Sequence, residues 1–327
     1  MNETAQTCDL TYFALAATAA SPPPRERPCQ APRELPDVLC GRYRVERLLG
    51  VGGMGAVYRV RDLLGEQFGN PEPYLALKTL SDSFIEYPDA TALLYSEFAL
   101  TARLNHRHVA RVFSFEVDSA SHRAFILLEL LQGLPLDQLL SERLEGLAWG
   151  ELQRIAIPLL EALCHCHEQG VLHGDLKPSN IMFAEGGLRL FDFGLGQPME
   201  GLLPGLPRLC RSRIAAWTPC YAAPEILEGA PLSATADVFG LACVLVELAN
   251  GQHPFSRLGS LQAREQQLEK RLQRPTDMPR HCWHALRTAL AFDEPDRRGS
   301  CAELLDAFRR PASRLWPWQK ASNAFTS

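Results

Sequence analysis

A glycine-rich segment near the start of the chain has the spacing of a phosphate-binding loop. Residues 50–57 read Gly-Val-Gly-Gly-Met-Gly-Ala-Val, which supplies Gly50, Gly52, Gly53 and Gly55. Glycine lets the backbone come within hydrogen-bonding reach of a nucleotide, where a side chain would block the approach. The spacing is weak by itself, because dinucleotide-binding folds share it.

The residues after the glycines distinguish two kinds of nucleotide site. A dinucleotide site requires a helix at this point, since the helix N-terminus binds the pyrophosphate. Here residues 56–62 read Ala-Val-Tyr-Arg-Val-Arg-Asp and alternate in polarity, which predicts a strand. We therefore expect the glycine loop to join two strands and to lie over the phosphates.

Charged and amide side chains follow in an order that suits phosphoryl transfer. Lys78 ends Leu-Ala-Leu-Lys on the next predicted strand, and Glu97 lies on the helix predicted after it. Later come His-Gly-Asp-Leu-Lys-Pro-Ser-Asn at 173–180 and Asp-Phe-Gly at 192–194. Carboxylate and amide oxygens are ligands suited to a Mg²⁺ ion that bridges phosphates, and lysine ammonium groups stabilise the developing charge.

This ordered set continues with Ala-Pro-Glu at 223–225, Asp237 and Arg298, and it resembles the eukaryotic-like (Hanks-type) Ser/Thr protein kinases. The segment from Leu49 to Tyr58 is most similar to their bacterial branch. The resemblance covers about residues 41–310. It implies an α+β fold of two lobes, a small β-rich N-lobe and a larger helical C-lobe.

The resemblance also implies a role for each charged residue, following the phosphoryl-transfer template of this family. Lys78 is expected to hold the α- and β-phosphates of ATP, and Glu97 to orient Lys78 through an ion pair. Asp175 would accept or orient the proton of the substrate hydroxyl. Lys177 would neutralise charge on the γ-phosphate.

The same resemblance implies the metal ligands and the substrate ledge. Asn180 and Asp192 are the expected ligands of Mg²⁺, or of Mn²⁺ in its place. Thr218 is expected to bond Asp175 or Lys177 and to shape the ledge on which the acceptor peptide lies.

The adenine ring is expected to bind between apolar residues near the glycine loop and the segment that joins the lobes. Each apolar position is also compatible with an ordinary core role. The expected lining is Leu49, Val57, Ala76 and Leu128, with Glu129–Leu131 as the hinge.

Two motifs indicate the acceptor. Asp-Leu-Lys-Pro at 175–178 and Trp-Thr-Pro at 217–219 resemble Ser/Thr rather than tyrosine kinases. The implied function is ATP-dependent phosphorylation of protein Ser/Thr hydroxyls, with autophosphorylation. The alternatives are a pseudokinase scaffold and a small-molecule kinase. Glu225 and Arg298 resemble the buried ion pair that ties the activation segment to the lower lobe.

The elements that must position these residues divide the chain in two. Strands predominate up to residue 131, with one helix over 89–105 and a loop over 65–73. The second part predicts helices near 136–143, 149–169, 234–250, 261–273, 281–291 and 301–309. The predicted units are an N-lobe, 41–131, and a C-lobe, 132–310. A poorly ordered proline-rich extension, 1–40, precedes them, with a short docking helix over 11–20 as the alternative. A basic and aromatic tail, 311–327, follows.

Composition excludes several classes of protein. The 327 residues are 46% hydrophobic and carry a net charge of −5, so no basic field predicts a nucleic-acid partner. No apolar run reaches the ~18 residues of a transmembrane helix. The ten cysteines are irregularly spaced, which favours reduced thiols and a cytoplasmic protein. Cys-His-Cys-His at 164–167 is interpreted as structural rather than metal-binding. The expected partners are protein substrates and a cognate phosphatase, whereas the oligomeric state is not predicted.

The residue before Asp175 departs from the family pattern. Gly174 stands where many kinases carry an arginine that receives a phosphate on the activation segment. Ser212 is the candidate acceptor in that segment outside the substrate ledge, and it lies between two arginines. A second candidate phosphorylation site is Ser313, in the tail.

We therefore predict that activity does not require phosphorylation of the activation segment. A Ser212→Ala protein should retain at least about a tenth of wild-type protein kinase activity, because no arginine at position 174 awaits the phosphate. Incorporation of labelled phosphate by the two proteins, measured side by side, checks this. Activity below that level would contradict the prediction.

Overall fold

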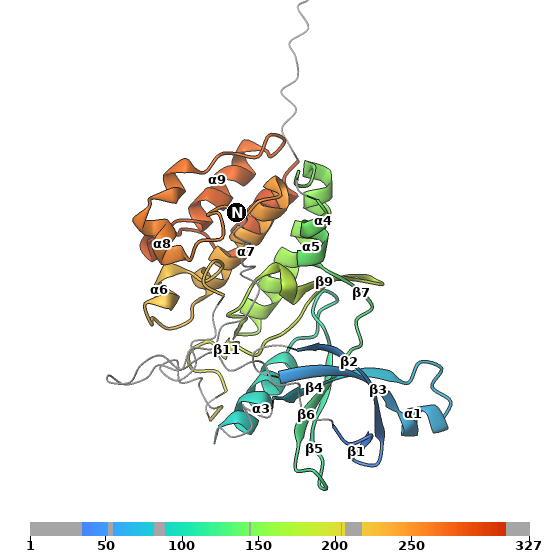
Figure 1. Ribbon diagram of the computed structural model, residues 1–327. Coiled ribbons are helices and arrows are strands. Elements are labelled where there is room, and N and C mark those ends of the chain that lie inside the picture. Colours follow the sequence, from blue (N-terminus) through green and yellow to red (C-terminus); the bar gives the residue numbers. More distant parts are fainter. Residues whose placement is uncertain are drawn as a thin grey trace, which may run out of the picture.

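The computed structural model describes residues 35–51, 55–81, 89–143, 145–203, 205–206 and 218–311. A strand-rich lobe packs beside a larger helical lobe (Figure 1), so the predicted α+β arrangement of two lobes is confirmed. Several predicted features lie outside the described residues: the extension up to residue 34, Gly52, Gly53, Ser212, Trp217 and the tail from residue 312.

The first lobe is one antiparallel sheet of six strands in the order β1-β2-β3-β4-β6-β5. Helix α3 packs against β4, β5 and β6. The strands are β1 (Val38–Leu39), β2 (Tyr43–Val51), β3 (Gly55–Asp62), β4 (Tyr74–Leu80), β5 (Val112–Val117) and β6 (Ala124–Leu128). The helices are α1 (Leu63–Gln67) and α3 (Ala90–Thr101).

Strand β6 shows why this sheet has an apolar core on each face. Successive side chains of a strand point to opposite faces. Phe125 and Leu127 therefore pack with Tyr43 and Leu77 in one buried cluster. Ile126 belongs to a second cluster that includes residues of α3. Because β6 contributes to both clusters, its nearly continuous apolar sequence follows from burial on two sides.

The strand register places the glycine loop beside Lys78. Gly50 of β2 pairs with Val57 of β3, and Val57 pairs with Lys78 of β4. These three residues form one row across the sheet, which continues to Ile126 of β6. The glycine loop thus joins β2 and β3, as predicted. Gly50 and Val57, which flank it, lie in the same row of the sheet as Lys78.

The loop predicted over 65–73 is partly wrong. Helix α1 extends through Gln67, because the Asp62 side chain caps it by accepting from the backbone N–H groups of Leu64 and Gly65. An aspartate at the N-cap satisfies N–H groups that the first helical turn leaves unpaired. Because the glycines and the asparagine after Asp62 favour a loop, the capping role of Asp62 was not predicted from the sequence.

The first lobe begins before the boundary drawn at residue 41. β1 pairs with β2, and Leu39 is 1% exposed within the cluster that contains Tyr43. Leu35 packs against the same cluster. Residues 35–40 are therefore part of the first lobe, because the sheet buries their apolar side chains.

The second lobe is helical and is built around α7. Nearly every residue of α7 is buried, as expected for a helix that is apolar on all sides. Ser233 caps its start and Gly251, in the left-handed conformation, ends it. The helices are α4 (Leu136–Glu142), α5 (Trp149–Glu168), α6 (Pro224–Leu227), α7 (Ala234–Asn250), α8 (Ser260–Glu265), α9 (Arg280–Ala289) and α10 (Cys301–Arg309). Short 3₁₀ turns are η1 (Pro178–Asn180), η2 (Leu268–Arg271) and η3 (Glu294–Asp296).

Two small sheets lie between the lobes and hold the connecting segments. One has the order β10-β9-β7, with β7 at Gly133–Pro135, β9 at Ile181–Ala184 and β10 at Gly187–Leu190. The other pairs β8 (Val171–Leu172) with β11 (Gln197–Pro198). The loop of residues 173–180, named the catalytic loop below, runs from β8 to β9.

Within the described ranges, no helix combines the length and the apolar character that crossing a membrane would require.

A buried histidine makes the helical lobe sensitive to acid. His253 follows α7, and its Nδ1 accepts the backbone N–H groups of Phe255 and Arg257 at 3.1 and 3.3 Å. Burial, together with the nearby charge of Arg257, lowers the pKa of His253 to about 3. A ring nitrogen that must accept two hydrogen bonds cannot also carry a proton.

We predict that His253 contributes to a loss of stability at mildly acidic pH. The unfolded chain binds a proton to this histidine below about pH 6.5, whereas the folded chain does so only near pH 3. The contribution is therefore complete above pH 6.5 and decreases as the pH falls towards 3. Between pH 7 and 5, urea unfolding of the wild type should lose about 1–2 kcal/mol more than that of His253→Asn, whose amide oxygen keeps an acceptor without titrating. Equal losses in the two proteins would contradict this.

Candidate active site

Lys78 lies between two carboxylates from different parts of the fold. Its Nζ is 2.6 Å from Oε1 of Glu97 on α3 and 2.7 Å from Oδ1 of Asp192, which follows β10. The side chain of Glu97 is 5% exposed, whereas that of Asp192 is 41% exposed. The Asp192 carboxylate is thus partly open to solvent while it pairs with Lys78.

The three charged groups shift one another's pKa values, in competition with the effect of burial. Burial opposes the ammonium of Lys78, but Asp192 and Glu97 outweigh it and raise the pKa of Lys78. For Asp192, burial is again outweighed, and Lys78 lowers the pKa of the carboxyl to about 2. Glu97 differs because burial prevails and raises its pKa, although Lys78 acts in the opposite direction. Lys78 therefore remains a cation across the physiological pH range.

The Asp-Phe-Gly segment has an unusual backbone. Asp192 has a φ of +66°, in the left-handed region that few residues other than glycine adopt. The side chain of Phe193 is buried and lies 4.6 Å from the ring of His173, centroid to centroid. Phe193 thus anchors the segment in the core while the adjacent Asp192 points to Lys78.

The catalytic loop brings a carboxylate, an ammonium and a hydroxyl into contact. Asp175 Oδ2 lies 2.8 Å from Lys177 Nζ. Thr218 Oγ1 donates to Asp175 Oδ1 at 3.0 Å and accepts from Lys177 Nζ at 3.1 Å. Both contacts expected for Thr218 are therefore present, although Thr218 is 43 positions from Asp175 and 41 from Lys177 in the chain.

Asn180 is oriented by the same aspartate. Its Nδ2 donates to the backbone oxygen of Asp175 at 2.8 Å and to Asp175 Oδ2 at 3.2 Å. Since the NH₂ group faces Asp175, the side-chain oxygen is the end of Asn180 suited to a cation. Asn180 is buried at the end of η1, which fixes its position relative to Asp175.

Asp237 on α7 fixes the backbone of the catalytic loop. Its Oδ2 accepts from the N–H of His173 at 2.9 Å, and its Oδ1 accepts from the N–H of Gly174 at 2.8 Å. His167 Nε2 of α5 lies 3.0 Å from Oδ2 of the same residue. The structural interpretation of His167 agrees with this contact, because the ring is used to hold a buried carboxylate.

His173 is a residue whose role the sequence interpretation did not single out. Its Nε2 lies 3.2 Å from the carbonyl oxygen of Phe191, and its Nδ1 accepts the N–H of Asp175 at 3.2 Å. Burial lowers its pKa, although Asp237 and Asp175 act against this. The ring is therefore neutral and joins the catalytic loop to the segment before Asp192. Its place two residues before Asp175 was the available signal.

The described glycines of the loop serve different purposes. A Cβ atom on Gly50 would meet nothing within 4 Å, so the space beside its backbone is open. A Cβ atom on Gly55 would lie 2.0 Å from the carbonyl oxygen of Thr79, because β3 and β4 approach closely there. Gly50 thus leaves room for a ligand, whereas Gly55 is required by the neighbouring strand.

The expected adenine residues lie on the strands that flank this open space. Ala76 is 7% exposed and pairs with Leu128 across β4 and β6. Leu49 of β2 is 39% exposed, and Val57 pairs with Gly50 and Lys78. At the hinge, Glu129 N donates to the Arg111 carbonyl at 2.9 Å, and Leu131 is half-buried.

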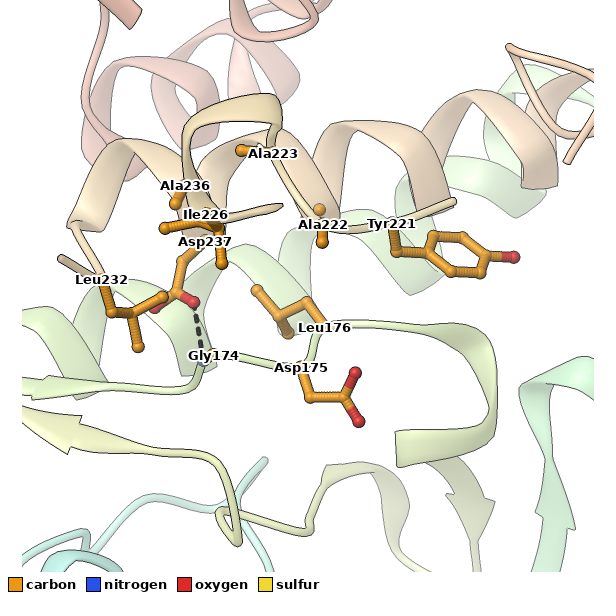
Figure 2. Close-up of a pocket in the computed structure, with 11 residues that line it drawn as sticks. Gly174, Asp175, Leu176, Tyr221, Ala222, Ala223, Ile226, Leu232, Ala236 and Asp237 are labelled. Carbon is orange, nitrogen blue, oxygen red and sulfur yellow. Dashed lines mark hydrogen bonds between the residues drawn. The ribbon is translucent and has the colours of Figure 1, made fainter. Parts of the chain in front are cut away.

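A small pocket lies between the catalytic loop and the segment that follows Thr218. Figure 2 shows Leu176, Ala222 and Ile226 around it, while the carboxylate of Asp175 points away from these apolar side chains. The dashed line in Figure 2 is the hydrogen bond from Gly174 to Asp237. Alanine side chains together with larger apolar ones such as Leu176 and Ile226 thus line the surface next to Asp175.

Tyr221 in this segment is a buried structural residue. Its hydroxyl donates to Glu247 Oε2, and Glu247 Oε1 lies 2.9 Å from Arg257 Nη2. Burial and the charge of Glu247 raise the pKa of Tyr221. The partners of Tyr221 come from α7 and from the residues after it, which are distant in the sequence.

The ion pair expected between Glu225 and Arg298 is wrong in one partner. Arg297 pairs with Glu225, and its side chain is 1% exposed. The guanidinium also lies 5.3 Å from the ring centroid of Phe239. Arg298 is exposed. Only one of the two adjacent arginines after η3 points into the lobe, and the sequence could not distinguish between them.

We predict that these two arginines differ sharply in their effect on stability. Arg297→Ala should lower the free energy of unfolding by about 3–5 kcal/mol, because it leaves the largely buried carboxylate of Glu225 unpaired. Arg298→Ala, the matched control, should change it by no more than about 0.5 kcal/mol, as is usual at exposed positions. Urea denaturation of the two variants measures both values. Similar losses, or a larger loss for Arg298→Ala, would contradict this assignment.

Comparison with known proteins agrees with this geometry. The chain matches the protein kinase domain family over residues 43–308. It is 30% identical over 282 residues to the serine/threonine-protein kinase PkaA of Streptomyces coelicolor, which covers 82% of this chain and 49% of that protein. It is 36% identical over 223 residues to the DNA damage-responsive serine/threonine-protein kinase RqkA of Deinococcus radiodurans, which covers 67% of this chain and 31% of that protein.

The fold is similar to solved kinase structures as well. The PknI kinase domain of Mycobacterium tuberculosis superposes with a TM-score of 0.60 at 27% identity, covering 83% of this chain and 96% of that one. The chain spans about half or less of the length of the curated relatives named above. The expected resemblance to bacterial Ser/Thr kinases and the bilobal kinase fold are both confirmed. Because the family match extends over most of its length, this chain belongs to the protein kinase domain family.

Proposed function

We propose that this chain is an active protein Ser/Thr kinase that transfers the γ-phosphate of ATP to Ser or Thr hydroxyls of proteins, itself included. The observation that carries the proposal is the contact of Asp175, Lys177 and Thr218, with Lys78 held between Glu97 and Asp192 nearby. Pseudokinases typically lack one of Lys78, Asp175 and Asp192, whereas here all three are present and oriented by specific partners.

The residues fit both a nucleotide and a divalent cation. Open space beside Gly50 supports approach of phosphate oxygens to the backbone. Asp192 keeps a partly exposed carboxylate, and Asn180 offers an amide oxygen, so both are hard ligands for Mg²⁺ or Mn²⁺. The bound cation would supply positive charge shared between phosphate oxygens. Leu49, Val57, Ala76, Glu129 and Leu131 are proposed to surround the adenine.

Lys78 and Glu97 act as a positioning pair in this proposal. Glu97 is held on α3 and fixes the Lys78 ammonium, which stays charged because two carboxylates raise its pKa. Lys78 would then bind the α- and β-phosphates. An already oriented cation needs little reorganisation when the nucleotide binds, which is the basis of electrostatic preorganisation.

Asp175 is proposed to orient the acceptor hydroxyl and to take its proton. Thr218 donates to Asp175 and accepts from Lys177, so the hydroxyl of Thr218 aligns the two charged groups. Lys177 would stabilise the charge that develops on the γ-phosphate oxygens. The in-line transfer then depends on positioning and charge rather than on covalent catalysis by the protein.

We further propose a cytoplasmic location, protein substrates and a cognate phosphatase. Seven described cysteines carry free thiols, and six of these are at least partly buried. Free thiols of this kind are typical of proteins in reducing compartments. The pocket of Figure 2, which lies beside Asp175 and is lined largely by apolar side chains, supports a peptide acceptor on this surface.

The central test is phosphate transfer by the wild type and by Asp175→Asn. Labelled ATP with Mg²⁺ and a generic basic protein should give incorporation into that protein and into the kinase. Asp175→Asn should reduce the rate about 10²- to 10⁴-fold, the range for loss of a general base. Asp277→Asn, an exposed aspartate outside the site, is the matched control and should keep wild-type activity.

Nucleotide binding separates loss of chemistry from loss of structure. Asp175→Asn should still be stabilised by ADP with Mg²⁺ in a thermal denaturation assay, because Asn180, Asp192 and Lys78 remain. Wild-type incorporation no higher than that of Asp175→Asn would refute the kinase proposal. Label found on a metabolite alone would instead favour a small-molecule kinase.

A further inference from the structure

Two cysteines from distant parts of the chain touch in the helical lobe. Cys164 is on α5 and Cys301 is the first residue of α10, and their Sγ atoms are 2.9 Å apart. They are separated by 137 positions in the sequence. Ordinary packing of two small apolar side chains does not require the sulfur atoms to face each other so closely, so this contact differs from the buried thiols elsewhere in the lobe.

The two helices are also held together by contacts on one side of the sulfur atoms, towards the start of α5 and the end of α10. Gln153 Nε2 of α5 donates to the carbonyl oxygen of Phe308 of α10 at 2.8 Å. Arg309 Nη2 lies 2.7 Å from Glu161 Oε1. Cys301 Sγ also lies 3.3 Å from the carbonyl oxygen of Leu160. A bond of about 2.05 Å between the sulfur atoms therefore needs only a small side-chain adjustment.

The two thiols differ in access and acidity. Cys164 is partly exposed, whereas Cys301 is 3% exposed. The hydrogen bond with Cys301 lowers the pKa of Cys164 and the charge of Arg309 acts in the same direction, while burial, Glu168 and Asp306 act in the opposite direction. The hydrogen bond with Cys164 and burial raise the pKa of Cys301. Cys164 is thus the sulfur that an oxidant reaches first and the one of the two that forms a thiolate more readily.

We propose that Cys164 and Cys301 form a redox-sensitive dithiol that a hydroperoxide closes into a disulfide between α5 and α10. This goes beyond the proposed kinase function and does not depend on it. The site is an oxidative modification site in the helical lobe, and its partner is a small peroxide rather than a protein.

The chemistry balances in two steps. The Cys164 thiolate attacks one oxygen of the peroxide, the O–O bond breaks, and the released oxygen leaves as water after it takes a proton. Cys164 is then a sulfenic acid. The sulfur of Cys301 attacks it, the S–S bond forms, the S–O bond breaks, and the hydroxide takes the Cys301 proton to leave as a second water. The two thiols lose two electrons and the peroxide gains them.

The neighbouring Cys166 provides a matched control. It lies two residues from Cys164 on the same helix but is fully buried, and burial raises its pKa. Residues two apart on a helix do not share a face, so Cys166 points away from α10. A serine at position 166 should leave the dithiol intact, whereas a serine at 164 or 301 should remove it.

The test uses the full chain, first reduced and then exposed to hydrogen peroxide in slight excess. After remaining thiols are blocked with N-ethylmaleimide under denaturing conditions, tryptic peptides 155–189 and 299–309 should be found joined, with one maleimide on Cys166 and two hydrogens fewer than the sum of the peptides. The midpoint of thermal unfolding should rise by about 5 °C, because the bond closes a long loop in the unfolded chain. Dithiothreitol should reverse both changes.

The variants decide the assignment. Wild type and Cys166→Ser should give the joined peptides, and Cys164→Ser and Cys301→Ser should not. Joined peptides in Cys164→Ser, their absence in Cys166→Ser, or peroxide-treated wild type with Cys164 and Cys301 both blocked by N-ethylmaleimide would overturn the proposal. Should Cys301→Ser fail to fold, Cys164→Ser gives the same answer, because its position is partly exposed.

Discussion

Asp237 is buried on α7, yet both of its carboxylate oxygens accept hydrogen bonds from the backbone of the catalytic loop. Removing a carboxylate from water costs several kcal/mol unless charge-assisted hydrogen bonds replace the lost hydration. His173, Gly174 and His167 supply those bonds, so the cost is offset only when the loop has this one conformation. Asp175 follows immediately after Gly174. The central helix α7, through Asp237, therefore determines the position of Asp175 more than the loop itself does.

A second constraint operates between the lobes. Lys78 belongs to the sheet and Asp192 to the segment after β10, so their ion pair crosses from one lobe to the other. If the lobes separate, Lys78 keeps Glu97 while Asp192 loses its cation. Whether Asp192 keeps its partner cation thus depends on how closely the lobes approach. When they are close, a nucleotide with its cation would enter a site whose charged side chains are already oriented.

How much the sequence could predict depended on whether a residue is fixed by local pattern or by long-range packing. The placement of Lys78 on a strand and of Glu97 on a helix follows from local periodicity, whereas their pairing was implied by the resemblance to protein kinases. The two lobes follow from the change from strand to helix patterns. Arg297 and Arg298 are adjacent and chemically identical, so only the packed lobe reveals which of them pairs with Glu225. The end of α1 was missed because the Asp62 cap outweighs the helix-breaking composition of the residues after it.

Two glycines of the loop, Gly50 and Gly55, are required for different physical reasons, although they belong to one sequence motif. Gly50 leaves open space beside the backbone, whereas Gly55 is enforced by the carbonyl of Thr79 on the adjoining strand. Natural selection would therefore act on these positions separately. A descendant of this chain that no longer bound a nucleotide could accumulate side chains at Gly50, yet it would retain Gly55 for as long as the sheet remained folded. The last glycine of the motif is thus required by the packing of the sheet, and the first by the space that a ligand would need.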